Sequence, residues 1–300
     1  MSFGLLKNER VEDVLRNIVR RQLRRPISVL ASDGRALENA IHESRKSVKK
    51  VRAVAALMEE AGAKLPRKDR KRLKSAARSL SGLRDSAVII EILELVRRRY
   101  PKQLPEHTFG ILRRHLVDSR DQQVTRAIGD GVMAESAAQL AKARKAARTW
   151  KSPSIDASDL VPIITASYRR SRKVMKRAQA NRLSATLHTW RKELKTLWYQ
   201  LRLIEPLAGG LSPLLANLKR LETDLGDDHN LVVLQATLRG CRDLRPMRDK
   251  LREIGRLAAR MRQPLRRRAF KVARRVYARK PKAFSRAVQA SMKTGTRRAA

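Results

Sequence analysis

At two places in this chain a histidine is followed by regularly spaced basic residues. The first row comprises His42, Arg45, Lys46, Lys49 and Arg52, and the second comprises His188, Arg191, Lys192 and Lys195. Side chains three or four residues apart lie on one face of a helix. At a rise of 1.5 Å per residue, His42 and Lys49 are about 10 Å apart along the helix axis, so one row can reach several linked phosphates together. The spacing therefore favours a site for a polyanion.

Each row belongs to a helix with a separate apolar face. At about 100° per residue, the first row fills an arc of about 120°. A different arc holds the apolar residues Leu37, Ile41, Val48, Val51, Ala55 and Met58. A basic stripe is usually only a solvated face, but such faces mix charges of both signs. Here Glu43 and Glu193 lie off the two rows, and the matched second copy favours a binding site over a solvated face.

The two rows are part of a longer internal repeat. Residues 37–58 and 183–204 align without a gap at an offset of 146, and residues 80–88 and 225–233 align at an offset of 145. This self-similarity predicts two related halves, at 31–150 and 155–290, behind an N-terminal helix within residues 1–30. Together they would form one domain over residues 1–290. Residues 291–300 would be a basic tail, loose from Gly295 onwards.

Apolar residues recur at helical spacing along nearly the whole chain, and glycine and proline fall between such segments. The predicted helices cover 8–30, 35–62, 67–80, 84–99, 106–128, 131–149, 161–182, 184–206, 212–225, 229–241 and 246–277, with a short helix after Pro281. Long helices joined by short turns predict an all-α fold made of helix bundles.

The composition of the chain limits the classes of binding partner and the cellular compartment that we expect. The formal net charge is +42, while 42% of residues are hydrophobic, which is enough for a packed core. Such a charge favours nucleic acid, an anionic membrane or a phosphate polymer as the partner. The single cysteine, Cys241, cannot form an intramolecular disulfide, and no apolar run approaches the roughly 18 residues of a membrane span. We therefore expect a cytoplasmic protein without a membrane-spanning segment.

Motifs for catalysis are weak. The histidines lack a metal-binding spacing such as H-E-x-x-H, and the sequence at 209–212 lacks the lysine of a phosphate-binding loop. Asp227, Asp228 and His229 could hold a divalent metal, but an aspartate just before an apolar helix more often caps that helix. The sequence therefore predicts a binding protein that is not an enzyme and uses no metal or cofactor.

The residues also resemble a known family. His42, Arg45, Lys49, Lys50 and Arg52 fit H-x-x-R-x-x-x-[KR]-[KR]-x-R, which resembles the first signature of the CHAD domain, the conserved histidine α-helical domain. In the second half, the residues that resemble the corresponding family signature are His188, Arg191, Lys192, Lys195 and Tyr199. The segment that contains Arg84, Asp85 and Val88 resembles the family's L-G-x-x-R-D-x-x-V element. Departures from the family pattern are Ser81 for glycine, Asn230 for aspartate, and Thr196 and Trp198 for basic residues.

The resemblance, which covers about residues 8–285, implies a fold and a function. The implied fold has two four-helix-bundle-like repeats related by pseudo-two-fold symmetry, with basic helices lining a central cleft or pore. The implied function is binding of inorganic polyphosphate and association with polyphosphate granules, whose proteins are further candidate partners. The candidate polyphosphate-binding residues are His42, Arg45, Lys46, Lys49, Lys50, Arg52, Arg84, His188, Arg191, Lys192, Lys195 and Tyr199. The E-x-E-x-K signature of the CYTH domain often fused to this family is absent, so the chain looks like the binding module alone.

Three alternatives stay open. Nonspecific nucleic-acid binding is expected at low salt from the charge alone, although the chain has only 3 Trp, 4 Tyr and 4 Phe on which bases could stack. The basic helix predicted at 246–277 could instead lie on an anionic membrane. His42 and His188, which should be neutral beside so many cations, could contact the ligand or form a structural bond between the halves. The oligomeric state is not set by the sequence.

Overall fold

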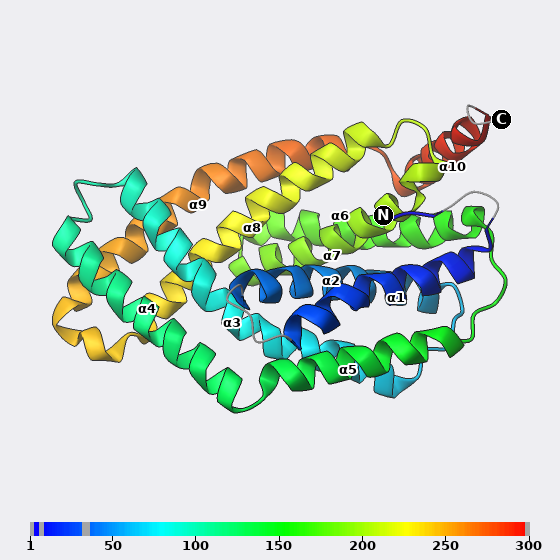
Figure 1. Cartoon of the computed structure of the whole chain (residues 1–300). Coiled ribbons are helices and arrows are strands. Elements are labelled where there is room, and N and C mark those ends of the chain that lie inside the picture. The colour runs from blue at the N-terminus through cyan, green and yellow to red at the C-terminus, as the bar shows by residue number, and fades with distance from the viewer. Residues whose placement is uncertain (1–2, 6–8, 32–36, 298–300) are drawn as a thin grey trace.

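A computed structural model describes residues 3–5, 9–31 and 37–297, and these residues are almost entirely helical (Figure 1). The α-helices are α1 (Val11–Leu30), α2 (Leu37–Glu60), α3 (Arg67–Arg99), α4 (Glu106–Gly129), α5 (Val132–Ala146), α6 (Leu160–Asn181), α7 (Ser184–Ile204), α8 (Ser212–Gly240), α9 (Arg248–Val276) and α10 (Pro281–Arg297). Short 3₁₀ turns are η1 (Ala147–Thr149), η2 (Ala157–Asp159), η3 (Glu205–Leu207) and η4 (Arg242–Met247). The described part of the chain forms no strand, and the predicted all-α class is confirmed.

Two predicted helix breaks are wrong. Helix α3 runs without interruption through residues 81–83, and α8 runs through residues 226–228. Gly82 and Gly226 lie in these two stretches, but a single helical glycine costs only about 1 kcal/mol, and packing on both sides of the glycine outweighs that cost. Since no helix begins at His229, the predicted capping role of Asp227 and Asp228 is also wrong.

The C-terminal segment is more ordered than predicted. Helix α10 continues to Arg297, so the predicted tail is helical over residues 291–297, and Gly295 lies inside the helix. Residues 298–300 of that tail lie outside the described residues. The amphipathic spacing predicted for 246–277 is confirmed, because α9 buries its apolar side, including Leu251, Ile254 and Leu257.

Two apolar cores hold the helices together. The larger core lies among α1, α2, α5, α6, α7 and α10 and includes the N-terminal parts of α3 and α8 and the C-terminal part of α9. The smaller core joins the C-terminal parts of α3 and α8 to α4 and α9. Each core takes residues from both predicted halves, so the core is not divided as the sequence repeat would divide it. The pseudo-two-fold relation between the halves stays a prediction.

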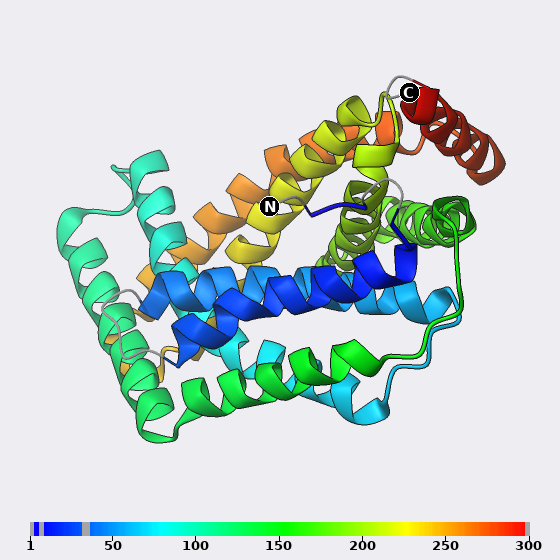
Figure 2. The same cartoon turned by 45° about the vertical axis from the view of Figure 1, so that its right-hand side comes forward.

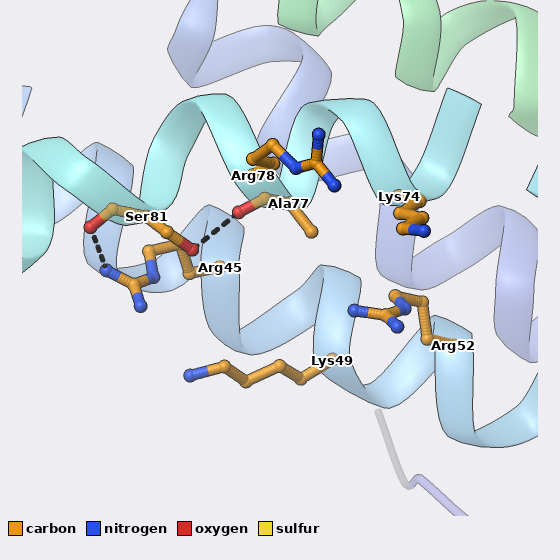
Figure 3. Close-up of a pocket in the computed structure, with 7 residues that line it drawn as sticks. All are labelled: Arg45, Lys49, Arg52, Lys74, Ala77, Arg78 and Ser81. Atoms are coloured by element: carbon orange, nitrogen blue, oxygen red, sulfur yellow. Dashed lines mark hydrogen bonds between the residues drawn. The ribbon is translucent and has the colours of Figure 1, made fainter. Parts of the chain in front are cut away.

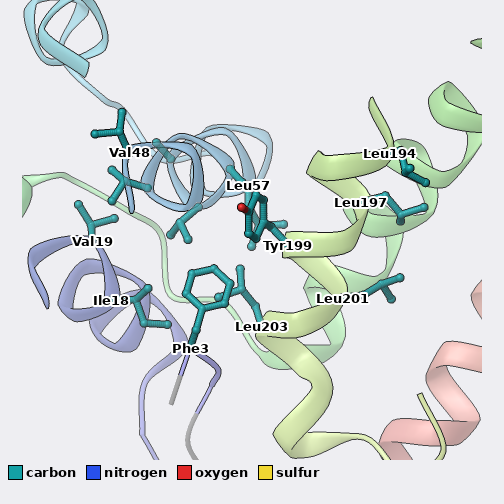
Figure 4. Packing of buried hydrophobic residues seen from close by; sticks show 14 of the residues in the cluster. Phe3, Ile18, Val19, Val48, Leu57, Leu194, Leu197, Tyr199, Leu201 and Leu203 are labelled. Atoms are coloured by element: carbon teal, nitrogen blue, oxygen red, sulfur yellow. The ribbon is translucent and has the colours of Figure 1, made fainter. Parts of the chain in front are cut away.

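Contacts between the predicted halves place the two basic rows close together. Helix α2 packs against α7, and α3 packs against α8 (Figure 2). In Figure 4, Phe3, Leu57 and Tyr199 lie where α1, α2 and α7 meet. Tyr199 meets Phe3 edge-on with ring centroids 6.0 Å apart, and the backbone N–H of Leu5 donates to the carbonyl of Leu203 at 2.7 Å. This packing fixes the helix that carries the first row beside the helix that carries the second.

Candidate functional site

Three residues of the first row, Arg45, Lys49 and Arg52, line a cavity between α2 and α3, which we call the α2–α3 cavity (Figure 3). Its volume is about 230 Å³, and it is lined by Arg45, Lys49, Arg52, Lys74, Ala77, Arg78 and Ser81. Five of these residues are cations and none is a carboxylate. Lys74 and Arg78 were missed as site residues, although their spacing of four along one helix is the signal that could have identified them. The cavity therefore has the electrostatic character of an anion site.

Arg45 is held in the wall of this cavity by two hydrogen bonds. Its Nη1 donates to the backbone carbonyl of Ser81 at 2.8 Å and to Asp85 Oδ1 at 3.1 Å. The Ser81 hydroxyl donates in turn to the carbonyl of Ala77 at 2.7 Å (Figure 3). Because these bonds use one nitrogen of the guanidinium, the remaining N–H groups of Arg45 can donate to a ligand.

Lys49 connects the two rows. Burial, followed by the positive charges of Lys195, Arg45 and Arg191, lowers the pKa of Lys49 to about 7, while Glu222 opposes this shift. Lys195 and Arg191 belong to the second row on α7, so the fold places cations of both rows within electrostatic reach of one lysine. An anion bound beside Lys49 would relieve this repulsion.

The second row is arranged differently, because a carboxylate occupies it. Glu222, buried on α8, accepts hydrogen bonds from Arg191 Nη2 at 3.1 Å and Lys195 Nζ at 2.9 Å, both through Oε1. Its Oε2 accepts from Lys219 Nζ at 3.0 Å. Burial alone would raise the pKa of Glu222, but Lys195 and Arg191 outweigh it and lower this pKa to about 2. Glu222 is therefore charged at any physiological pH.

A glycine makes room for the second-row arginine. A Cβ atom at Gly226 would lie 3.2 Å from Arg191 Nη2, which is closer than most side-chain contacts, and 3.5 Å from its Nε, in ordinary contact. The absence of a side chain at this position lets the guanidinium lie against α8. In the first half, Ser81 has the aligned position, and its carbonyl accepts from Arg45.

Both predicted row histidines have lowered pKa values. Burial, followed by the charge of Arg84, lowers the pKa of His42, whose side chain is about half exposed. Burial and the neighbouring His229 lower the pKa of His188 to about 4, and these two rings stack with centroids 4.1 Å apart. Both row histidines are thus neutral near pH 7, as predicted, with burial as the larger cause. His188 Nδ1 is buried and has no hydrogen-bond partner among the described residues.

Other candidate residues lie away from the α2–α3 cavity. Lys50 donates to Gln22 at 3.3 Å on the side facing α1, and Arg84 pairs with Glu91 at 3.0 Å. Lys46 pairs with Glu43 at 3.4 Å, and Lys192 is exposed on α7. Tyr199 is 4% exposed and lies in the larger core. Ligand contact by these residues stays a prediction.

A second basic cavity lies between the C-terminal end of α8 and the N-terminal part of α9. Its volume is about 920 Å³, and its wall includes Arg239, Arg242, Arg245, Arg248, Arg252 and Arg256 above the apolar side chains of Leu238, Leu244 and Leu251. The sequence predicted a basic outer surface on this segment but no hollow. The turn η4, which connects α8 to α9, contributes Arg242, Leu244 and Arg245 to the wall of this cavity.

Comparison with known proteins gives the family. The CHAD domain model matches residues 13–239, so the chain belongs to the CHAD domain family, which is associated with polyphosphate binding in general. The crystal structure of the CHAD domain from the plant Ricinus communis is similar over 93% of this chain and 95% of that chain, with a TM-score of 0.64 and 17% identity, and therefore shows the same fold. No match was found among curated proteins.

The described residues lack the features of two other classes of site. No group of three or more histidine, cysteine, aspartate or glutamate side chains there has an arrangement that could hold a metal ion. No helix there is both long enough and apolar enough to cross a membrane.

Proposed function

We propose that this chain binds inorganic polyphosphate without chemically changing it, and that the α2–α3 cavity is the principal contact. The observation that supports the proposal is the cavity lined by five cations and no carboxylate. Four of the five, Lys49, Arg52, Lys74 and Arg78, have no carboxylate partner within the described part of the chain. Cations that face a common hollow without internal counter-charges repel each other, and a bound polyanion removes that repulsion.

Aromatic burial favours a phosphate polymer over single-stranded nucleic acid. Every Trp, Tyr and Phe of the chain is described, and none is exposed. Trp190 is fully buried, and Trp198 has Arg202 and Lys219 within 5.1 and 5.5 Å of its ring. Proteins that bind single strands without sequence preference stack bases on accessible aromatic rings. The surface of this chain offers phosphate contacts but no ready stacking platform.

We expect binding to depend strongly on the number of linked phosphates. Dispersed cations act together only on a linked polyanion, so long-chain polyphosphate should bind at least about a hundredfold more tightly per phosphate than orthophosphate. Titration calorimetry at several salt concentrations measures this difference. Equal affinity per phosphate for the monomer and the polymer would contradict a multivalent site.

The binding is proposed to be non-catalytic, and association with polyphosphate granules is proposed as its cellular consequence. The proposal rests on the lack of a nucleotide-binding loop or metal-binding motif in the sequence. Incubation of the purified chain with long-chain polyphosphate and Mg²⁺ or Mn²⁺ should leave the chain length unchanged. Sustained phosphate release that a point substitution abolishes would overturn this part.

Lys49 gives the binding a pH dependence with a defined sign. Since the pKa of Lys49 is about 7 in the free protein, and an adjacent polyanion raises it, binding above pH 7 takes up a proton. Affinity for long-chain polyphosphate should therefore fall as pH rises from 7 to 9, by up to about tenfold per pH unit. His42 and His188 have pKa values below their usual 6.5 and are neutral through this window.

The Lys49→Met variant isolates this contribution. Its affinity should be lower at pH 7 and should change less between pH 7 and 9, as measured by titrations in buffers of different ionisation enthalpy. Lys195, whose pKa is also lowered by burial, is partnered by Glu222 and stays in the variant as an internal reference. An identical slope in the variant and the unaltered chain would show that Lys49 does not take up the proton.

A further inference from the structure

We propose that the Glu222 carboxylate occupies a second anion site in the way that a bound phosphate would, so that the chain holds one open site and one closed site. This inference rests on the proposed function for the identity of the anion. It concerns why two similar basic rows have different surroundings.

Glu222 receives the contacts that an anionic ligand would receive. Its side chain is 8% exposed, and both of its oxygens accept charge-assisted hydrogen bonds, from Arg191, Lys195 and Lys219. The donors come from α7 and α8, as the cavity cations of the first half come from α2 and α3. A carboxylate held at 2.9 to 3.1 Å gives each of the three cations one anionic acceptor without an external ligand, while Arg191 Nε stays buried without a partner among the described residues.

The alignment shows that the second site keeps three of the five cavity cations and gains a carboxylate. Trp198 and Thr223 stand at the positions of the other two cations, Arg52 and Arg78. At the offset of 146, Arg191 and Lys195 align with Arg45 and Lys49. At the offset of 145, the aligned pairs are Lys74 with Lys219 and Ala77 with Glu222. Arg45, Lys49, Lys74 and Ala77 all line the α2–α3 cavity. A methyl group therefore forms the wall of the open site at the position where the closed site has its carboxylate.

The arrangement predicts how a polyphosphate chain is placed. A phosphate that entered the second row would have to displace a carboxylate that is covalently attached and therefore always present. A phosphate that enters the α2–α3 cavity meets four unpartnered cations. Glu222 thus limits the number of strongly held phosphates and directs the ligand to the first half.

Removal and transfer of this carboxylate test the proposal, with tripolyphosphate as the probe. Glu222→Gln should lower the melting temperature in the absence of anion, because three cations lose their partner. Titration calorimetry should then show two equivalents of tripolyphosphate bound instead of one, and the probe should raise the melting temperature of the variant more than that of the unaltered chain. Ala77→Glu should fill the open site and weaken binding at least about tenfold. The double variant should regain one site.

Matched controls separate local from general charge effects. Glu106→Gln removes an exposed carboxylate on α4, and Gln123→Glu adds one at an exposed position on the same helix. Neither should change the number of sites. The proposal would be overturned if Glu222→Gln bound a single equivalent of tripolyphosphate and was stabilised by it only as much as the unaltered chain. Unchanged affinity of Ala77→Glu for tripolyphosphate would also overturn it. This second result decides the question if Glu222→Gln does not fold. These results would leave polyphosphate binding intact, whereas an unaltered chain that binds neither tripolyphosphate nor long-chain polyphosphate would refute the proposed function itself.

Discussion

Replacing Arg45, Lys49 and Arg52 together by glutamine is expected to weaken binding of long-chain polyphosphate by about a hundredfold or more. The three side chains line the α2–α3 cavity from α2. A charge-assisted contact with a phosphate contributes about 1–3 kcal/mol, and neighbouring contacts are only partly additive, so a combined loss of about 3 kcal/mol is the lower estimate. Binding isotherms at one fixed salt concentration provide the measurement.

A second triple variant controls for net charge. Lys280 directly precedes α10, Lys282 and Arg286 lie within it, and all three side chains are exposed. Helix α10 lies apart from α2 and α3 in Figure 1, and replacement of the three residues by glutamine removes the same number of formal charges. Only the general electrostatic attraction should decrease in this variant. If circular dichroism shows both variants to be helical and both lose affinity equally, the binding is a property of overall charge and the assigned site is wrong.

Replacing Asp228 by asparagine is expected to lower the free energy of unfolding by about 3 kcal/mol. Asp228 is 2% exposed and accepts hydrogen bonds from Arg262 Nε at 3.0 Å and Arg266 Nε at 2.8 Å. Arg262 also donates to the Ser184 hydroxyl at 2.6 Å, so the cluster joins α8 to α9 and to the start of α7. Removal of the only carboxylate of such a cluster leaves two partly buried guanidinium groups uncompensated.

Chemical denaturation measures this loss, with Asp249→Asn as the control. Asp249 also pairs with an arginine, Arg252 at 3.0 Å, but its side chain is 93% exposed. An exposed pair of this kind contributes less than about 1 kcal/mol. Similar stability for the two variants would show that the buried cluster does not hold the helices together.

The first row could be predicted from sequence because it depends only on the spacing of residues within one helix. His42, Arg45 and Lys49 share a helix face whose position follows from the helical period, and the structure places the opposite face in the core. The continuity of α3 and α8 could not be predicted in this way. Their middle segments contain helical glycines, and what keeps them helical is packing against two cores built from distant parts of the chain.

The carboxylate partners of the basic residues could not be predicted from a local sequence pattern either. Glu222 reaches Arg191 and Lys195 across 31 and 27 residues, and nothing in the α8 sequence marks it as their counter-charge. Asp228 shows the same limit, since its position before an apolar stretch favoured a helix cap, whereas its partners lie on α9. Side-chain pairing between helices depends on tertiary geometry that periodicity does not contain.

The measurement that tests the central claim most directly is a competition between long-chain polyphosphate and single-stranded DNA for the full chain. Fluorescence anisotropy of a labelled DNA would be followed while polyphosphate of equal phosphate concentration is added at a salt concentration of about 0.15 M. We predict that polyphosphate displaces the DNA, with at least about a tenfold preference per phosphate, since no aromatic side chain of the chain is fully exposed for bases to stack on. DNA that stays bound under these conditions would contradict polyphosphate as the principal ligand.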